Sequence, residues 1–169
     1  MGEEDVEIRM DDAIECTHEH VTIGLFVGKN QAGSKVLERV LVRAVGLNRF
    51  RILATPGLAS GIARGDEIQL QRDTGEFRVL GRGGFVGIQI YGLSSEVDRF
   101  SLELRELGGW LDSRSKDLTV FSIPVSVGFP RIEAFMRHFV MNYPGSLWYY
   151  ANVYGDDGIT PLNWWKNQA

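Results

Sequence analysis

The chain has 169 residues, of which 44% are hydrophobic and 24% are charged, and its formal net charge at pH 7 is −4. This composition is typical of a globular protein, and the length suits one domain or two small ones with a buried core. Cys16 is the only cysteine, which excludes an internal disulfide, and no apolar run approaches the 18 residues of a membrane-spanning helix.

The first 20 residues are strongly acidic, with eight acidic residues and one basic residue, Arg9. They contain no signal-peptide pattern, so we expect a cytoplasmic protein in which residues 1–20 form a mobile acidic head. Cys16, His18 and His20 alternate at its end and would point to one side of an extended chain. A fourth zinc ligand is not evident, so we predict no metal, with binding by these three residues as an open alternative.

Residues 21–84 have the pattern of short strands joined by tight turns. Apolar and β-branched residues dominate residues 35–45, and Ile68 and Leu70 alternate with glutamines. The DTGE sequence at residues 73–76 predicts a hairpin turn. Five or six strands without a helix predict a small antiparallel β-barrel or curled sheet, because closure removes exposed strand edges.

Residues 85–155 alternate between strand and helix patterns, which predicts an α+β half. We expect strands at 85–92 and 146–155, helices at 94–109 and 130–144, and a β-hairpin over 109–125. This order, βαββαβ, is the ferredoxin-like arrangement, in which two helices cover one face of a four-stranded sheet. The glycine-rich residues 81–87 are the predicted joint between the halves, and residues 156–169 form an aromatic C-terminal tail.

The stretch ATPGLASGIARGDEIQL, residues 54–70, runs from a strand through a proline-containing turn to a Gly-Asp pair and a second strand. Together with the order of the elements, it resembles the DUF4265 family, a bacterial family of unknown function, over most of residues 20–155. The resemblance implies a β-rich first half followed by a two-helix α+β half. It carries over no catalytic residue.

Two glycine-rich motifs have structural explanations. Phosphate-binding loops take amides from a helix N-terminus, whereas GIARGDEI leads into a strand. We therefore expect Gly61 and Gly65 to permit tight turns and Asp66 to cap the turn before the strand. GRGGFVG lacks the spacing of a dinucleotide motif, and Gly83 and Gly84 are expected to let the two halves pack closely. We predict no cofactor.

A basic first half raises nucleic-acid binding as a minority alternative. Residues 21–84 hold ten basic and five acidic residues. The arginines that would line one surface are Arg39, Arg43, Arg49, Arg51, Arg72, Arg78 and Arg82. Stacking platforms would have to come from Phe50 and Phe77, which alternate as core residues do, so nucleic acid is an unlikely partner.

The C-terminal region is rich in aromatic residues, which are Trp148, Tyr149, Tyr150, Tyr154, Trp164 and Trp165. On an extended strand Trp148, Tyr150 and Tyr154 would share one face. If the helices leave that face free it suits a binding surface; otherwise the rings form an inter-domain core. The predicted partner-binding residues are Trp148, Tyr150, Tyr154, Asp156, Asp157 and Trp164.

No motif for covalent or metal-dependent catalysis occurs in the sequence, which favours a non-enzymatic role. We predict a cytoplasmic protein-binding module with a protein partner. One specific form is a bacterial immunity protein that neutralises a cognate basic toxin domain, since acids flank the aromatic surface. The alternative is a small-molecule sensor or enzyme with its ligand between the two halves.

Overall fold

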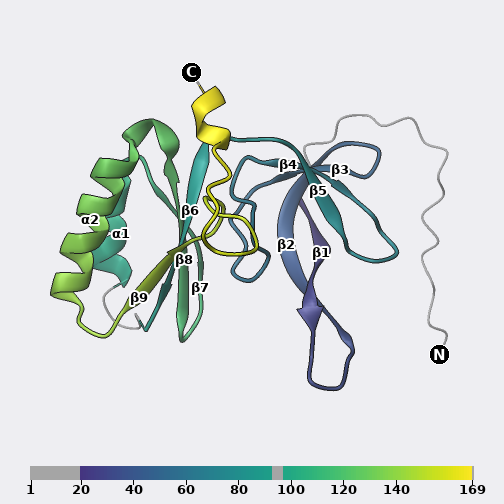
Figure 1. Ribbon diagram of the computed structural model, residues 1–169, viewed down its shortest axis with the longest axis horizontal. Helices are drawn as coiled ribbons and strands as arrows, with labels where there is room; N and C mark the ends of the chain where they lie inside the picture. The colour runs from purple at the N-terminus through teal and green to yellow at the C-terminus, as the bar shows by residue number, and fades with distance from the viewer. Residues whose placement is uncertain (1–19, 93–96, 169) are drawn as a thin grey trace.

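The computed structural model describes residues 20–92 and 97–168. Two antiparallel sheets lie side by side, and both helices pack against the outer face of the second sheet (Figure 1). Most of the acidic head, including Cys16 and His18, lies outside the described residues.

The first sheet has five antiparallel strands in sequential order. They are β1 (His20–Lys29), β2 (Lys35–Gly46), β3 (Arg49–Ile52), β4 (Glu67–Leu70) and β5 (Phe77–Gly81). The alternating pattern of β4 is borne out, since Ile68 and Leu70 are buried while the residues between and before them are half-exposed. Leu25, Val42 and Ile52 join them in a first hydrophobic core.

The prediction of a β-barrel or curled sheet for residues 21–84 is wrong, because the sheet stays open with β1 and β5 as its edges. β1 and β2 have 10 and 12 residues, whereas β3, β4 and β5 have only four or five. Strands of such unequal length do not supply the continuous ladder that closure requires. The turn after β4 does bend back, and Gly75 O accepts a hydrogen bond from Phe26 N (2.8 Å). Ala59 and Ile62, from the loop between β3 and β4, are buried in this core.

The second sheet follows the βαββαβ order predicted from the sequence. Its elements are β6 (Phe85–Tyr91), α1 (Val97–Glu106), β7 (Trp110–Arg114), β8 (Leu118–Pro124), α2 (Phe129–Asn142) and β9 (Leu147–Tyr150). Two 3₁₀ helices, η1 (Val125–Val127) and η2 (Trp164–Asn167), complete the chain. The spatial order is β7-β8-β6-β9, so β7 and β9 form the edges of the sheet.

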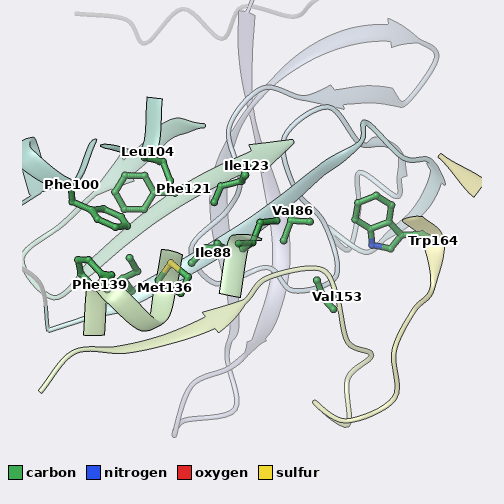
Figure 2. Packing of buried hydrophobic residues seen from close by; sticks show 12 residues of the cluster. Val86, Ile88, Phe100, Leu104, Phe121, Ile123, Met136, Phe139, Val153 and Trp164 are labelled. Atoms are coloured by element: carbon green, nitrogen blue, oxygen red, sulfur yellow. The ribbon is translucent and has the colours of Figure 1, made fainter. Parts of the chain in front are cut away.

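Helices α1 and α2 cover one face of this sheet and enclose the second hydrophobic core. Figure 2 shows the cluster running from Phe100 and Phe139 of the helices, past Ile88 of β6, to Trp164 of η2. The apolar stripe of each helix is buried in it, as helical periodicity predicts. Within the described residues, neither helix has the length and hydrophobicity needed to cross a membrane.

A long loop, residues 53–66, covers the opposite face of the second sheet. The sequence left open whether this face is free for another molecule or covered by the protein's own chain, and the loop covers it. Thr55 Oγ1 and Ser122 Oγ of β8 lie 2.6 Å apart. A Cβ placed on Gly87 of β6 would come within 2.7 Å of Thr55 and 2.8 Å of Ala151. The loop lies flat on the sheet because small residues meet at this contact.

Three carboxylates, from β2, from β7 and from the end of the loop itself, bind backbone N–H groups of the loop. Glu38 of β2 accepts hydrogen bonds from the backbone N–H groups of residues 57–59, at 2.6–2.9 Å. Asp112 of β7 accepts one from Thr55 N (3.0 Å), and Asp66 accepts one from Ala63 N (3.0 Å). These bonds satisfy backbone groups that a buried loop would otherwise leave unpaired.

The predicted structural role of Gly61, Gly65 and Asp66 is confirmed, whereas Gly83 lies closest to Gly65, which belongs to the first half as well. Gly61 and Gly65 have φ values of 82° and 84°, which side chains rarely adopt. The Asp66 side chain caps the turn before β4. A Cβ on Gly83 would lie 2.2 Å from the carbonyl carbon of Gly65, so the backbones of the two motifs approach too closely for any other residue.

Candidate functional site: an aromatic groove along an edge strand

A groove of about 390 Å³ runs beside β9 at the margin of the second sheet. It is lined by Ser60, Trp148, Tyr149, Tyr150, Ala151, Tyr154, Gly155, Asp156 and Gly158. Trp148 and Tyr149 point to opposite faces of the strand, as neighbouring strand residues must, yet both line the groove. The groove therefore follows the edge of β9 rather than one of its faces.

Stacked aromatic rings form one wall of the groove. The ring centroids of Trp148 and Tyr150 are 5.0 Å apart and nearly perpendicular, at 86°. Phe129 of α2 packs edge-on against Tyr150 at 5.8 Å and against Trp165 at 4.9 Å. Such edge-to-face contacts hold the rings in fixed orientations, so the wall is rigid before any partner arrives.

The Tyr150 hydroxyl keeps its proton at physiological pH. Burial raises the pKa of Tyr150 far above its ordinary value of 10.0, and the nearby Glu133 carboxylate raises it further. The hydroxyl donates a hydrogen bond to Glu133 Oε1 across 3.4 Å. Tyr150 thus provides an apolar ring and a neutral donor, which suits binding rather than acid–base catalysis near pH 7.

The loop that follows β9 lines one end of the groove. Tyr154 and Pro161 form a β-bridge across this loop. The Thr160 hydroxyl donates a hydrogen bond to Asp157 Oδ2, and Asp157 Oδ1 accepts hydrogen bonds from Thr160 N (2.8 Å) and Ile159 N (2.9 Å). These bonds, with that of the Thr160 hydroxyl the strongest cause, lower the pKa of Asp157 to about 2. Asp157 therefore builds the loop and does not line the groove, whereas the exposed Asp156 does line it.

Trp164 is in the protein core. Its side chain is 8% exposed, and its Nε1–H donates a hydrogen bond to Asn152 O (2.7 Å). The Arg82 guanidinium lies over its ring at 5.6 Å. This tryptophan holds the C-terminal tail against the second sheet, and its ring meets the chain's own backbone rather than the solvent.

Four of the six predicted partner-binding residues thus meet in one groove, namely Trp148, Tyr150, Tyr154 and Asp156. Trp148 and Tyr150 do not lie on a face of the sheet that the helices leave free. They lie on the helix-covered face and pack against the core there. They reach the surface only because β9 is an edge strand.

Sequence reasoning missed five of the residues that line the groove, among them the aromatic Tyr149 and the distant Ser60. Tyr149 alternates with the predicted residues and was assigned to the other face, although an edge strand exposes both. It is 54% exposed and packs edge-on against Tyr91 at 5.9 Å. Ser60 comes from the loop on the other half of the chain, and no local pattern indicates that it lies here.

A second hollow, of about 470 Å³, lies between the two helices. It is lined by Arg99, Glu103, His138, Phe139, Asn142 and Tyr143. Its polar groups are engaged with one another, since Arg99 Nε lies 3.8 Å from Glu103 Oε1 and Asn142 Nδ2 lies 3.1 Å from His138 Nε2. The groove along β9 has the more accessible aromatic surface and is the stronger candidate.

The centre of the interface between the two halves is filled by the chain's own side chains. Asp112 contacts the Ser122 hydroxyl and forms an ion pair with Arg64. The Arg64 guanidinium lies over the Trp110 ring, at 5.0 Å from its centroid. Thr55 completes this network. A small-molecule ligand between the halves would have to enter at the interface margin, where Ser60 meets β9.

The arginines of the first half are largely engaged within it. Arg49 and Arg51 both contact Glu67, and Arg82 is paired with a buried carboxylate. Phe50 is 4% exposed, so it offers no platform for a nucleic-acid base. Phe77, the other predicted stacking residue, is half-buried at the start of β5, so the expectation that nucleic acid is an unlikely partner stays a prediction.

The metal alternative rests on residues outside the described part of the chain, apart from His20. That side chain is exposed, and its Nε2 lies 3.3 Å from Nη2 of Arg43. Across residues 20–92 and 97–168, no group of His, Cys, Asp or Glu side chains is arranged to hold a metal ion.

Comparison with known proteins adds a family and a fold. A family model described as a domain of unknown function (DUF4265) matches residues 38–142. A crystal structure of a hypothetical protein from Neisseria gonorrhoeae is similar, with a TM-score of 0.61 and 14% sequence identity. The similarity covers 79% of this chain and 96% of that one, and at this identity it bears on the fold alone. No curated protein matches. The matched family region ends before β9, so Ser60 is the one groove-lining residue within it.

Proposed function

The chain belongs to the DUF4265 family, whose domains have no known function, and we propose that it is a protein-binding module. The proposed contact surface is the aromatic groove along β9, with Trp148, Tyr150, Tyr154 and Asp156 as its partner-binding residues. The observation that carries the proposal is the gathering of tyrosine and tryptophan side chains in one open groove at a sheet edge.

Aromatic side chains with a polar tip are well suited to such a surface. Tyrosine and tryptophan dominate the binding energy of protein interfaces because they bury large areas with few rotatable bonds. Tyr149 is 54% exposed and Tyr154 is 38% exposed, so both have area left to bury. Because Trp148 and Tyr150 are braced by neighbouring rings, a partner would pay little entropy to order them.

The charge of the groove favours a basic partner. Asp156 is the one charged residue among those that line it, and all of these lie in the described part of the chain. Asp157 adds a second carboxylate beside it, ionised at any pH well above 2. Opposite charge on a partner would speed association and fix its register. A toxin domain as that partner is the most specific form of the proposal, and its support is the small acidic chain and the absence of catalytic motifs in the sequence.

A small molecule is the second candidate occupant. The groove volume of about 390 Å³ is within the range of ligand sites, and Ser60 and β9 bring together both halves of the chain there. The two candidates differ in the size of the interface. A protein partner would bury on the order of 800 Å² on this chain and extend beyond the groove, whereas a small ligand would not.

The test is a comparative affinity purification. The full chain and its Trp148→Ala, Tyr154→Ala and Trp110→Ala variants are immobilised and exposed to a native lysate of the source organism, and retained proteins are quantified by mass spectrometry. Trp110 is 55% exposed on the opposite edge strand, which makes Trp110→Ala the size-matched control.

We expect one or more proteins to be retained by the wild type and the control and lost by both groove variants. The purified partner should bind each groove variant at least about 30-fold more weakly, which corresponds to about 2 kcal/mol. Equal affinity of all four proteins for that partner would refute the groove as the contact surface.

A further inference from the structure

We infer that the partner binds as an extended segment that pairs with β9 and adds a fifth strand to the second sheet, with a basic side chain directed at Asp156. This inference rests on the proposed function and names the chemistry of its partner. It follows from a comparison of the four sheet edges in the molecule.

Three of the four edge strands carry a β-bulge. The register of β1 shifts between Phe26 and Gly28, so Val27 has no opposing residue. In β5 the extra residue is Leu80, and in β7 it is Asp112. Bulges twist an edge and interrupt its hydrogen-bonding groups, and proteins use them to prevent edge-to-edge pairing.

β9 has no such protection. Its four residues pair with β6 in an unbroken register from Leu147 to Tyr150. Its sequence, LWYY, contains no charged residue and no proline, whereas each of the other three edge strands includes a lysine or an arginine. An edge strand without a bulge, a charged residue or a proline, lined by a groove, is suited to receive a short strand.

The backbone of β9 presents the required groups on its outer side. Ala151 N donates a hydrogen bond to Gly87 O of β6, at 2.8 Å. Because backbone groups alternate sides along an antiparallel strand, Tyr149 also faces β6, while the N–H and C=O groups of Trp148 and Tyr150 face away from it. A partner strand would pair with Trp148 and Tyr150.

The groove also offers contacts to the side chains on both faces of an incoming strand. One set would lie over the Trp148 and Tyr150 rings, and the alternate set would lie over Tyr149 near Ser60. The loop that carries Asp156 follows β9 and lines the groove, and the paired segment would have about the length of β9. A lysine or arginine at that end would meet the Asp156 carboxylate.

The experiment uses a phage-displayed library of random linear dodecapeptides selected against the full chain. We expect selected peptides to contain four or five residues rich in β-branched and aromatic types next to a lysine or arginine. A synthetic peptide from the selection should bind the Trp148→Ala and Tyr154→Ala variants at least tenfold more weakly and bind Trp110→Ala with unchanged affinity. The Asp156→Lys variant should lose affinity for this peptide and regain it when the basic residue is replaced by glutamate.

Backbone pairing is tested by two further measurements on the same peptide. N-methylation at alternate peptide residues, which removes the amides that face β9, should weaken binding more than tenfold, while N-methylation of the residues between them should not. In hydrogen-exchange NMR of the full chain, the amides of Trp148 and Tyr150 should become at least tenfold more protected when the peptide binds.

The outcomes distinguish strand addition to β9 from the more general proposal that the groove is a binding surface. Binding that depends on Trp148 and Tyr154 but leaves the two amides unprotected, with equal effects of N-methylation at every position, would overturn strand addition and retain the groove as a binding surface. Failure to select any peptide, or selection of peptides that bind all variants equally, would overturn both.

Discussion

Replacement of Trp164 by alanine should destabilise the protein strongly although this residue lies only five positions before the C-terminus. The side chain is 8% exposed, packs in the second core and donates a hydrogen bond to Asn152 O. Removal of a buried tryptophan side chain typically costs about 3–5 kcal/mol, which includes the cavity and the acceptor left without a donor. For a chain of this length, with a urea m-value of about 2 kcal/mol/M, the unfolding midpoint should fall by roughly 1.5–2.5 M.

The assay is urea unfolding of the full chain followed by far-UV circular dichroism, which does not depend on tryptophan emission. Trp110→Ala is the control, because Trp110 is 55% exposed and its main partner is the Arg64 guanidinium; it should cost less than about 1 kcal/mol. Trp164→Phe keeps an aromatic ring and should fall between the two. If Trp164→Ala costs no more than the Trp110 control, the tail does not belong to the core and the reasoning fails.

Three further changes test other parts of the structure. Gly83→Ala should lower the free energy of unfolding by about 1–3 kcal/mol, measured by thermal or urea unfolding, because its Cβ would lie 2.2 Å from the Gly65 backbone. The control is Gly81→Ala, which places its Cβ in open space and should change stability by less than about 0.5 kcal/mol. Similar costs for the two variants would contradict the close approach of Gly83 to Gly65. Burial raises the pKa of Asp66 above its ordinary value of 3.8, so its contribution to stability is complete below that value and declines as pH rises through the raised pKa. The difference in unfolding free energy between wild type and the non-titrating Asp66→Asn variant should therefore shrink from about pH 4 upward, and a difference that grows would reverse the sign of this argument. The NMR signal of the Asp157 carboxyl carbon should titrate near pH 2, and in the Thr160→Val variant its midpoint should return toward the ordinary value. Any stability that the Asp157 carboxylate provides is lost as pH falls through about 2. An ordinary midpoint in the wild type would contradict the hydrogen bonds from Thr160 and Ile159 to Asp157.

Much of the secondary structure was predictable from local pattern. Alternation in residues 66–73 and the helical stripes of the second half record which side of each element is buried, and burial is the strongest constraint on residue choice. The element order βαββαβ and the family resemblance followed from these patterns. The roles of Gly61, Gly65 and Gly83 were predictable for a similar reason, since glycine is required where no Cβ fits or φ is positive.

The candidate site was only partly predictable. The density of aromatic residues pointed to Trp148, Tyr150 and Tyr154, and the neighbouring Asp156 followed as a flanking charge. Their exposure could not be derived, because the alternation of a strand does not reveal whether that strand is central or at an edge. Trp164 had the same composition signal as Trp148, yet a hydrogen bond and a core contact placed it inside the protein.

By itself, the sequence determined which segments are strands and helices and which of their side chains avoid water, because these properties depend on neighbours within a few residues. The tertiary structure alone decided that the first sheet stays open, that residues 53–66 cover the second sheet, and that Ser60 meets β9 at a groove. Those outcomes depend on unequal strand lengths and on carboxylates such as Glu38, which bind backbone groups roughly twenty residues away. A local pattern states that a surface is buried, whereas only the packed chain shows what covers it.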